Sequence, residues 1–387
     1  MKILYFMNHV CQGGAALALY DLIVELKNNY DVEMVVFTGK QNQLNDMLDS
    51  IGVENHVAPY KNFMSSTHYP IWLWRVLLRI RHDICLPFAI KKIEKEVNVA
   101  DFDIIHSNLN RIDIGAIIAK KYNKLHLWHI REHGQGGDFD MISIFKNIER
   151  YMESFDNRYV AISESVKKEW EGIGIPADKI DLIYDGVRTE KLCPDNNVHN
   201  GKIKIIFLGG YTQAKGQEIL IDSVEKLSPS YLDKIQIDFY GNDINKYKSV
   251  LLKKVKKSGL SGCISLYGYD SDIYCKINQY DIGVNCRRKE GFGRVTVEYM
   301  LAGLCVIATD TGANSEIIRN QETGFLFDYG NTNELKDILS HLIDNRESIK
   351  IIGKKASEDA NANFTMKIHA KQIYQEYNRI LSNKAST

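Results

Sequence analysis

The sequence lacks a long uncharged hydrophobic run. No apolar stretch reaches ~18 residues without a charge, so we expect no membrane-spanning segment. The opening stretch MKILYFMNHV is too short for the hydrophobic region of a secretion signal, and no small-residue cleavage site follows it. These features predict a cytoplasmic protein.

An excess of charge of either sign is also missing. The 49 basic residues balance 49 acidic ones, which removes the global electrostatic case for a nucleic-acid partner. The 7 cysteines are odd in number and include no C-x-x-C pair, and several lie in apolar runs, which favours reduced, structural thiols.

Metal-binding patterns are equally scarce. No cluster of His and Cys has the spacing of a zinc site. Short aspartate pairs at 101–103, 138–140 and 270–272 resemble those that hold Mg²⁺ on a diphosphate, but the first merely precedes an apolar run. We therefore expect no metal and no cofactor.

What the chain does contain is a repeated strand–helix pattern. Its 387 residues suffice for two domains of about 150–200 residues each. Short runs rich in Ile and Val recur, each followed by a polar turn and a helical stretch, as in buried parallel sheets of α/β proteins. The pattern weakens at LCPDNNVHNGK and then restarts. We predict an N-terminal domain at 1–190, a linker at 191–202, a C-terminal domain at 203–365 and a final helix at 366–387 that packs back on the N-terminal domain.

One segment, residues 69–96, breaks this rhythm. It is helical in period and carries Trp72 and Trp74 among several Arg and Lys residues. One interpretation is an inserted helix packed on its own domain. The other is an interfacial helix whose aromatic rings and cations contact an anionic membrane.

Two glycine turns follow predicted strands. Gly13 and Gly14 open the first predicted helix, and Gly209 and Gly210 occupy the same place in the second half, with Lys215 shortly after. Backbone N–H groups at such helix starts attract anions. Neither turn is G-x-G-x-x-G, so a nicotinamide-dinucleotide site is a poor fit. A tight turn and a solvated lysine remain the alternative.

Ionisable groups also follow two strands of the first half. His106 ends the run DIIHS, and Arg131 and Glu132 directly follow LHLWHI. The carboxyl ends of parallel strands are where ligands bind in such sheets. The alternatives are a core histidine and an ordinary surface loop.

The most informative stretch is KEGFGRVTVEYMLAGLCVIATDTG, residues 289–312. Gly291 and Gly293 allow a sharp turn at a helix start, which presents N–H groups and the positive end of the helix dipole. Glu290, just before the turn, has the chemistry to accept hydrogen bonds from sugar hydroxyls. Glu298 falls about two turns along, where its carboxylate suits a ribose diol. The alternative is an amphipathic helix with an ordinary exposed glutamate.

On these residues the chain resembles the retaining GT-B glycosyltransferases of glycosyltransferase family 4. EGFGRVTVEYMLAG is similar to the family's E-x7-E motif, and CVIATDTGANSEII and TGFLF are similar to the segments that follow it. In the first half the glycine pair, HSN after Ile105, and AISES at 161–165 have counterparts. The resemblance covers almost the whole chain and implies two Rossmann-like domains facing a central cleft.

The resemblance also implies roles for individual residues. Glu298 would bind ribose, and His106 would lie at the transferred sugar. The diphosphate would be neutralised by Lys215, beside Gly210. Two further sets of donor contacts are implied. One is Glu290 with the N–H groups that follow it, at Gly291, Phe292, Gly293 and Arg294. The other is the glycine pair Gly13 and Gly14, from the other domain.

Three departures from the family pattern stand out. Tyr211 and Thr212 stand where the family often has an arginine, so one phosphate cation is missing. The residues before Glu290 read NCRRK where the family usually has a Pro-Ser-like sequence, and we hypothesise that Arg287 or Arg288 supplies the lost charge. Asp185 stands where the family commonly has asparagine, a mild change because both residues tolerate turns.

The resemblance implies retaining transfer of a sugar from a nucleotide-sugar, most often a UDP-sugar, to a hydroxyl. We expect a glycan or polyprenyl-linked acceptor in bacterial surface polysaccharide synthesis, at the inner face of the cell membrane. Two alternatives stay open. One is a soluble-acceptor transferase or phosphorylase of the same fold, and the other is a non-catalytic nucleotide-sugar-binding protein.

Overall fold

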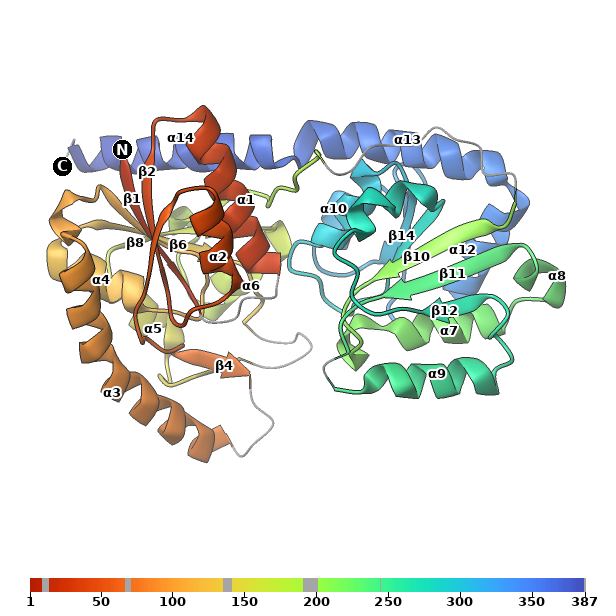
Figure 1. Ribbon diagram of the computed structural model, residues 1–387, viewed down its shortest axis with the longest axis horizontal. Helices are drawn as coiled ribbons and strands as arrows, with labels where there is room; N and C mark the ends of the chain where they lie inside the picture. Colours follow the sequence, from red (N-terminus) through yellow and green to blue (C-terminus); the bar gives the residue numbers. More distant parts are fainter. Residues whose placement is uncertain (9–13, 67–70, 135–140, 191–200, 244, 386–387) are drawn as a thin grey trace. The chain divides into compact units, whose positions relative to one another are not determined.

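The computed structural model describes residues 1–8, 14–66, 71–134, 141–190, 201–243 and 245–385. Gly13 and residues 191–200 of the predicted linker lie outside the described residues. The chain divides into two compact units, which are described separately (Figure 1). Unit 1 comprises Met1–Gly186 and Met366–Thr387, and unit 2 comprises Val187–Thr365.

The first unit therefore ends a few residues before the predicted boundary at residue 190. Val187 pairs with Thr365 in an isolated parallel bridge, and its N–H donates to the carbonyl of Phe364 at 3.0 Å. These contacts attach Val187 to unit 2.

Unit 1 is built on a parallel sheet with the order β3-β2-β1-β5-β6-β8-β9. All the residues of β5 are buried, as expected for a strand in the middle of a sheet covered on both faces. The strands are β1 Lys2–Met7, β2 Glu33–Thr38, β3 Glu54–Val57, β5 Ile104–Ser107, β6 Leu125–Ile130, β8 Asn157–Ala161 and β9 Ile180–Leu182; a separate antiparallel pair joins β4 Met64–Ser66 and β7 Met141–Ser143.

The helices of unit 1 begin at recognisable signals. Asn42 forms a capping box at the start of α2, and the Ser163 side chain accepts from the N–H of Val166 at 3.1 Å at the start of α6. The helices are α1 Gly14–Asn29, α2 Gln43–Ser50, α3 Ile71–Glu96, α4 Ile114–Tyr122, α5 Ile148–Met152, α6 Glu164–Ile173 and α14 Met366–Ala385.

The last helix, α14, packs on unit 1. It lies beside α1, and Ala370, Ile373, Tyr377 and Ile380 belong to the same hydrophobic core as β1 and β5. The spacing of these four residues is that of one helix face, which explains why this helix belongs to unit 1 although the chain reaches it from unit 2.

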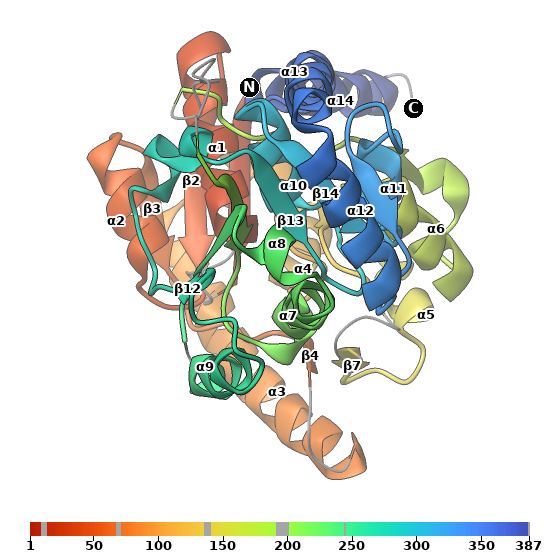
Figure 2. The same ribbon diagram turned by 90° about the vertical axis from the view of Figure 1, so that its right-hand side faces the viewer.

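Unit 2 has a second parallel sheet with the order β12-β11-β10-β13-β14-β15. Helices α7 and α9 lie on one side of it and α10 and α13 on the other (Figure 2), so the predicted doubly wound α/β architecture is confirmed. The elements are β10 Ile203–Leu208, β11 Ile235–Tyr240, β12 Ile264–Leu266, β13 Ile282–Asn285, β14 Cys305–Thr309, β15 Phe325–Phe327, α7 Gln217–Glu225, α8 Pro229–Leu232, α9 Tyr247–Lys257, α10 Arg294–Leu301, α11 Asn314–Ile317, α12 Thr332–Asp344 and α13 Arg346–Asn363.

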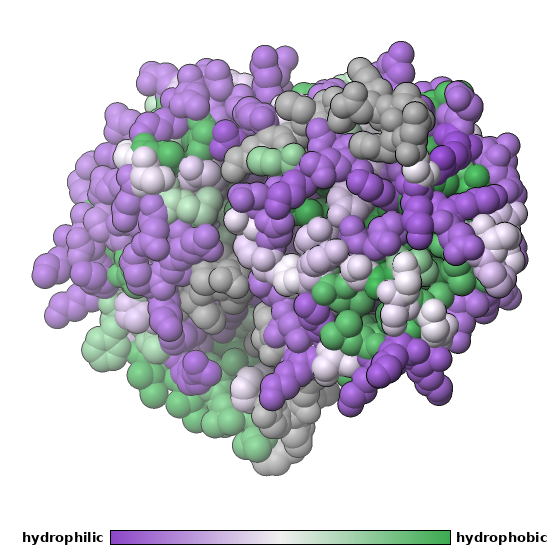
Figure 3. Space-filling model, turned by 45° about the vertical axis from the view of Figure 1, so that its right-hand side comes forward, coloured by the Kyte–Doolittle hydropathy of each residue, from purple (hydrophilic) through white to green (hydrophobic). Residues whose placement is uncertain are grey.

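Helix α3 exposes a row of large apolar side chains. Its carboxyl-terminal half is anchored, since Ala89 and Ile93 are fully buried in the core of unit 1. Figure 3 shows a hydrophobic surface along this helix. The exposed apolar residues of α3, which we call the α3 stripe, are Leu73, Val76, Leu77, Ile80, Ile84 and Phe88. Within the described residues, every helix is too short or too polar to cross a membrane.

Candidate functional site

The site in unit 2 is built around the turn between β13 and α10. Glu290 precedes the turn, and its carbonyl accepts from the N–H of Ala313 at 3.0 Å. Gly312 pairs with Glu290 in a parallel bridge and has a φ of +60°. A Cβ at Gly312 would lie 2.4 Å from the Glu290 carbonyl oxygen. Only glycine allows this approach of two backbones, which holds Glu290 at the helix start.

Four buried polar side chains brace this turn from below. The amide of Asn285 donates to the Thr296 hydroxyl at 3.0 Å, and that hydroxyl donates to Asn314 at 2.9 Å. Thr309 donates to the carbonyl of Arg287 at 2.6 Å and accepts from Asn314 at 3.3 Å. The sequence reasoning missed this network, because its members come from four elements and no spacing links them. Only Asn285 and Thr309 carry a local signal, a polar residue at the end of an apolar run.

Glu298 is the fifth residue of α10 and is only 4% exposed. Tyr274, a residue that the sequence reasoning did not single out, lies close enough for the charge of Glu298 to act on it. The charge of Glu298 is the largest cause that raises the pKa of Tyr274, followed by burial. Glu298 is therefore a buried carboxylate, and the alternative of an ordinary exposed glutamate is wrong.

Lys215 lies beside the second glycine turn. Its aliphatic carbons would be 3.5 Å from a Cβ at Gly209, so the side chain runs along the end of β10. The next residue, Gly216, has a φ of +74°, and a Cβ there would meet the carbonyl oxygen of Cys286 at 2.3 Å. The segment carrying Lys215 thus adjoins the residues that lead from β13 into the turn at Glu290.

The two arginines before this turn differ in their surroundings. Arg287 donates to both carboxylate oxygens of Glu290 at 3.2 Å. Arg288 is exposed, and its guanidinium lies 6.0 Å from the ring centroid of Tyr329. Tyr211 cannot replace the missing cation, because it is fully buried and its hydroxyl donates to two backbone carbonyls.

Within the turn, Phe292 contributes its backbone rather than its ring. The side chain is 3% exposed and packs edge-on against Phe364, with ring centroids 6.1 Å apart. Gly293 takes a left-handed φ of +83° as the residue before α10, and Arg294 is the first residue of the helix. Gly291, Gly293 and Arg294 thus stand where N–H groups emerge at a helix start.

In unit 1 the predicted contact of the transferred sugar, His106, lies in the core. The side chain is fully buried, and its Nδ1 shares a 2.6 Å hydrogen bond with the hydroxyl of Tyr377 on α14. Tyr5 stacks at a ring-centroid distance of 5.0 Å and His129 at 5.4 Å. Burial, followed by the charge of Arg131, holds the pKa of His106 well below its usual value. His106 is thus a neutral core residue.

The residue that follows two positions later organises the carboxyl end of β5. Asn108 donates to the carbonyl of Ala15 at 3.1 Å, which fixes the first turn of α1 beside Gly14. Its Oδ1 accepts from Arg131 Nε at 3.0 Å. Arg131 is 5% exposed and pairs with Asp185 at 2.6 Å, so this candidate lies in a buried ion pair.

The other charged candidate of that loop, Glu132, is bound locally. It pairs with Arg111, and its backbone carbonyl accepts from the indole of Trp170 at 3.0 Å. These contacts join the end of β6 to α6 and to the loop after β5. Glu132 therefore has a structural role within unit 1.

The described residues contain one group of side chains spaced to hold a metal ion. Donor atoms of His129, Asp185 and His369 lie within 4.8 Å of one another, and all three residues are buried. The guanidinium of Arg131 already supplies a positive charge to Asp185. A divalent cation would add a second buried charge without a compensating anion. We therefore interpret the group as an ion pair flanked by two histidines.

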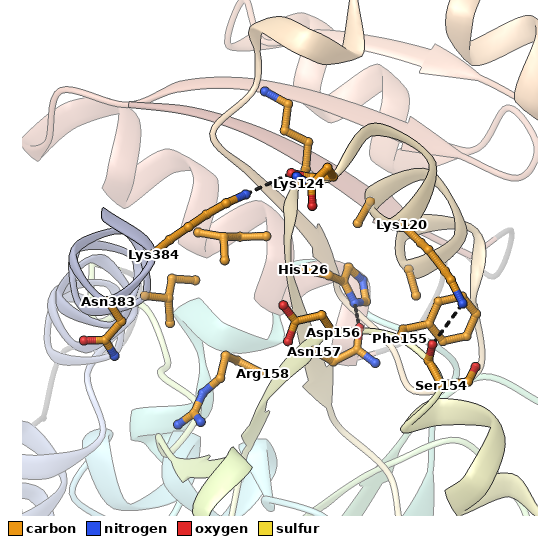
Figure 4. A pocket seen from close by; sticks show the side chains of 15 residues that line it. Lys120, Lys124, His126, Ser154, Phe155, Asp156, Asn157, Arg158, Asn383 and Lys384 are labelled. Atoms are coloured by element: carbon orange, nitrogen blue, oxygen red, sulfur yellow. Dashed lines mark hydrogen bonds between the residues drawn. The ribbon is translucent and has the colours of Figure 1, made fainter. Parts of the chain in front are cut away.

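A hollow of about 540 Å³ opens in unit 1 where β6 and β8 begin (Figure 4). Its lysines donate to backbone carbonyls: Lys120 to Ser154 at 3.1 Å and Lys384 to Asn123 at 2.8 Å. Ligands of parallel sheets bind at the carboxyl ends of strands, and this hollow lies at the opposite ends. It is therefore not the donor site.

Two family models match the chain. One, described as Glycosyltransferase Family 4, matches residues 12–191, and the other, described as Glycosyl transferases group 1, matches residues 189–359. The two matches follow each other along the chain and coincide closely with the change of unit near residue 187.

Similar proteins agree with these models. An uncharacterized glycosyltransferase of Methanocaldococcus jannaschii is 27% identical over 79% of this chain and 84% of its own length. The capsular polysaccharide biosynthesis glycosyltransferase CapH of Staphylococcus aureus is 22% identical over 82% of this chain and 83% of its own length.

Among solved structures, HepE of Anabaena in complex with UDP superimposes with a TM-score of 0.80 at 20% identity, over 98% of this chain and all of that one. That likeness establishes the fold, with its two Rossmann-like domains, and the sequence matches establish the kind of enzyme. The chain is a GT-B glycosyltransferase that belongs to the families of glycosyltransferase family 4 and glycosyl transferases group 1.

Proposed function

We propose that this glycosyltransferase moves a sugar from a UDP-sugar to a hydroxyl of a glycan or polyprenyl-linked acceptor, with retention of configuration. The observation that carries the proposal is the arrangement of Glu290, Glu298 and Lys215 in unit 2. All three follow the central strands β10 and β13, from which the strand order runs outward in both directions. Such a switch point is where nucleotides bind in open parallel sheets.

The proposed chemistry concerns the departing diphosphate. Breaking the anomeric C–O bond places negative charge on it, and a preorganised cation with a helix start stabilises that charge. Lys215, Arg287 and the N–H groups of Gly291 to Arg294 fill these roles in our proposal, without a metal ion. Glu298 takes the ribose hydroxyls, and Glu290 takes hydroxyls of the sugar.

Retention follows from a front-face route in this proposal. The departing phosphate oxygen accepts the proton of the acceptor hydroxyl, which attacks from the same side of the sugar. This route needs no carboxylate nucleophile and no histidine, so it is compatible with the burial of His106. The route also requires that water is kept from the donor, because water otherwise hydrolyses the sugar–phosphate bond.

The proposal is tested by assaying a panel of nucleotide-sugars for slow hydrolysis by the purified chain. We expect one UDP-sugar to be hydrolysed, with faster release of UDP when the correct acceptor is added. Glu290→Gln should lower the rate by ~100-fold, the scale of losing one group that acts on the transition state. Glu322→Gln, which alters an exposed glutamate of the same unit paired to Arg319, should leave the rate unchanged.

The same assay separates the alternatives. A non-catalytic binding protein would bind UDP-sugars but release UDP at the same rate with and without acceptors. A soluble-acceptor transferase or phosphorylase would turn over with free sugars or phosphate and would ignore lipid-linked glycans. Hydrolysis of another class of nucleotide-sugar, with none of a UDP-sugar, would contradict the choice of UDP.

We further propose that the α3 stripe rests on the inner face of an anionic membrane, where a polyprenyl-linked acceptor resides. The exposed fractions along the stripe rise to 59% at Ile84 and 64% at Phe88. A contiguous apolar row of this kind commonly marks an interaction surface. Arg79 and Arg81 beside the row suit anionic lipid. The capsule-forming role of the Staphylococcus aureus relative supports an acceptor of this class.

Flotation with liposomes tests this contact. The wild-type chain should float with phosphatidylglycerol vesicles and much less with phosphatidylcholine vesicles. The double variant Ile84→Asp/Phe88→Asp should lose flotation while it keeps slow donor hydrolysis. Ile351→Asp, which places the same charge at an exposed apolar position of α13, is the matched control and should float. Equal flotation of all variants, or none by the wild type, would contradict the contact.

A further inference from the structure

Helix α9 of unit 2 concentrates positive charge on a surface that the proposed donor site does not use. The helix, Tyr247–Lys257, carries five lysines and neither an acidic residue nor an arginine. The whole chain, by contrast, balances 49 basic residues with 49 acidic ones, so the charge of α9 is a local feature. The exposed apolar and basic residues of this helix, which we call the α9 face, are Val250, Leu252, Lys253, Lys256 and Lys257.

We propose that the α9 face is a second contact with an anionic lipid surface, electrostatic in kind and located on unit 2. This inference rests on the proposed function for its choice of partner, because the α3 stripe of unit 1 is proposed to rest on the same kind of surface. It adds a site on the other unit and a source of selectivity for anionic lipid.

The two sides of α9 differ sharply. Leu251 is fully buried and Val255 is 3% exposed, and both belong to the hydrophobic core of unit 2. This inner side packs beside α7 (Figure 2). Lys253 stands three residues before Lys256 and four before Lys257, so these three lysines lie on neighbouring positions of the helix surface. The helix is therefore anchored on one side and presents its charge to solvent on the other.

The lysines of α9 also differ in what they contact. Lys254 pairs with Asp222 of α7 at 2.6 Å, and the ammonium of Lys248 lies 5.7 Å from the ring centroid of Tyr211. The side chains of the three lysines of the α9 face form no ion pair with any residue that the structure describes. Their charge is thus left for a partner outside the chain.

The placing of these charges has a cost within the helix. The helix dipole favours cations in the last turn, but like charges three and four residues apart repel each other. An acidic residue on the same face would relieve this repulsion, and α9 has none. A negatively charged surface relieves it instead, and such a surface attracts each lysine that comes near it.

The composition of the α9 face favours lipid over a nucleic acid. Lysine is a point charge without a fixed hydrogen-bonding geometry, whereas arginine is preferred where a phosphate is bound in a fixed, bidentate manner. Lysine therefore suits headgroups that move laterally. Val250 is 49% exposed and Leu252 is 47% exposed beside these lysines. Exposed apolar side chains among clustered lysines are typical of a helix that lies on an anionic membrane.

The test is the binding of the whole chain to vesicles with a rising fraction of phosphatidylglycerol, measured by sedimentation. The triple variant Lys253→Gln/Lys256→Gln/Lys257→Gln should bind phosphatidylglycerol vesicles ~10–100-fold more weakly than the wild type, the scale of losing three lysines at an anionic surface. Its binding should also depend less on salt, because fewer charges are screened. Unchanged slow hydrolysis of the donor shows that the variant is folded.

The matched control changes three exposed lysines of another helix of unit 2. It alters the net charge by the same amount, but α13 also carries acidic residues, so its surface is mixed in sign. The control should bind vesicles as tightly as the wild type. It is the triple variant Lys350→Gln/Lys354→Gln/Lys355→Gln.

The outcomes separate the α9 face from the α3 stripe. If the α9 variant binds like the wild type while Ile84→Asp/Phe88→Asp loses binding, the α9 face is not a contact and the α3 stripe stands. Weakening in the α9 variant but not in the α3 variant supports the α9 face and removes the stripe. Equal weakening in both lysine variants would show an effect of net charge and overturn the inference. No binding by the wild type would overturn both membrane contacts, whereas sugar transfer is tested separately by donor hydrolysis.

Discussion

The two units share one plan but bury their polar groups in different places. In unit 1 one network of buried polar groups lies in the core between the sheet and α14, where Tyr5, His106 and Tyr377 form a hydrogen-bonded chain. In unit 2 a comparable network gathers at the carboxyl ends of β13 and β14, beneath the turn at Glu290. Buried polar groups thus fix a helix in one unit and the turn at Glu290 in the other.

The largest effect is expected where two backbones touch in unit 2. Gly312→Ala places a Cβ 2.4 Å from the Glu290 carbonyl oxygen at a φ of +60°, so the turn must move. We expect a loss of about 3 kcal/mol or more in the free energy of unfolding of unit 2, together with loss of UDP binding. Urea unfolding and calorimetry measure the two quantities.

Gly330→Ala is the control for that substitution. Gly330 also has a left-handed φ, +82°, but a Cβ there would meet nothing within 4 Å. This change should cost ~1 kcal/mol and leave UDP binding intact. Equal effects of the two substitutions would mean that the contact at Glu290 does not shape the site.

The next effect is that a fall in pH should lower the stability of unit 1 more than that of unit 2. Burial lowers the pKa of His126 to about 4 and holds the pKa values of His106 and His129 well below the usual value. Below pH ~6.5 the unfolded chain takes up protons that these folded histidines refuse, so the stability of unit 1 falls as the pH falls. His82 opposes this trend: burial lowers its pKa, but the hydrogen bonds and charges of Asp113 and Asp83 together raise the pKa above its usual value.

The unfolded state of unit 1 then binds about two more protons than the folded state. The free energy of unfolding of unit 1 should therefore fall by ~4 kcal/mol between about pH 6.5 and 5. His341 is the single histidine among the described residues of unit 2, so that unit should change less through this cause. Hydrogen exchange followed segment by segment at both pH values measures this difference. An equal loss in both units would contradict it.

A smaller effect is expected from the hydroxyl at the centre of the unit 1 chain. Tyr377→Phe removes a buried group bonded to Tyr5 at 2.8 Å and to His106 at 2.6 Å. Unit 1 should lose ~1–3 kcal/mol, and UDP binding should not change. Tyr374→Phe, on the same helix but only partly buried, is the control in thermal unfolding and should have little effect. A change in UDP binding in Tyr377→Phe would contradict the claim that this network only stabilises unit 1 and that UDP binds in unit 2.

The smallest effect concerns the hypothesis that an arginine supplies the missing phosphate charge. Arg287 is held at Glu290, whereas Arg288 lies over Tyr329. Arg287→Ala should weaken binding of the donor by ~3–10-fold, the value of an ordinary charged contact, and Arg288→Ala should have less effect. Calorimetry with UDP compares them. Wild-type affinity in both variants would show that neither arginine acts on the phosphates.

The sequence was sufficient to predict what depends on local pattern. Apolar runs with intervening turns predicted both sheets, and the glycines around Phe292 predicted the helix start at Arg294. It was insufficient where distant segments meet. His106 looked like a ligand at a strand end, because no local signal reveals that α14, some 270 positions later, covers it. Tyr274 escaped notice for the same reason, since Glu298, whose charge acts on it, lies on another element.

The most direct measurement of the central claim is hydrogen exchange of the whole chain with and without UDP, read by mass spectrometry. Our account predicts protection in unit 2 at residues 208–216 and 286–298, with the strands of unit 1 unchanged. Protection confined to unit 1, or absent from both segments while UDP is bound, would contradict the assignment of the donor site to the turn between β13 and α10.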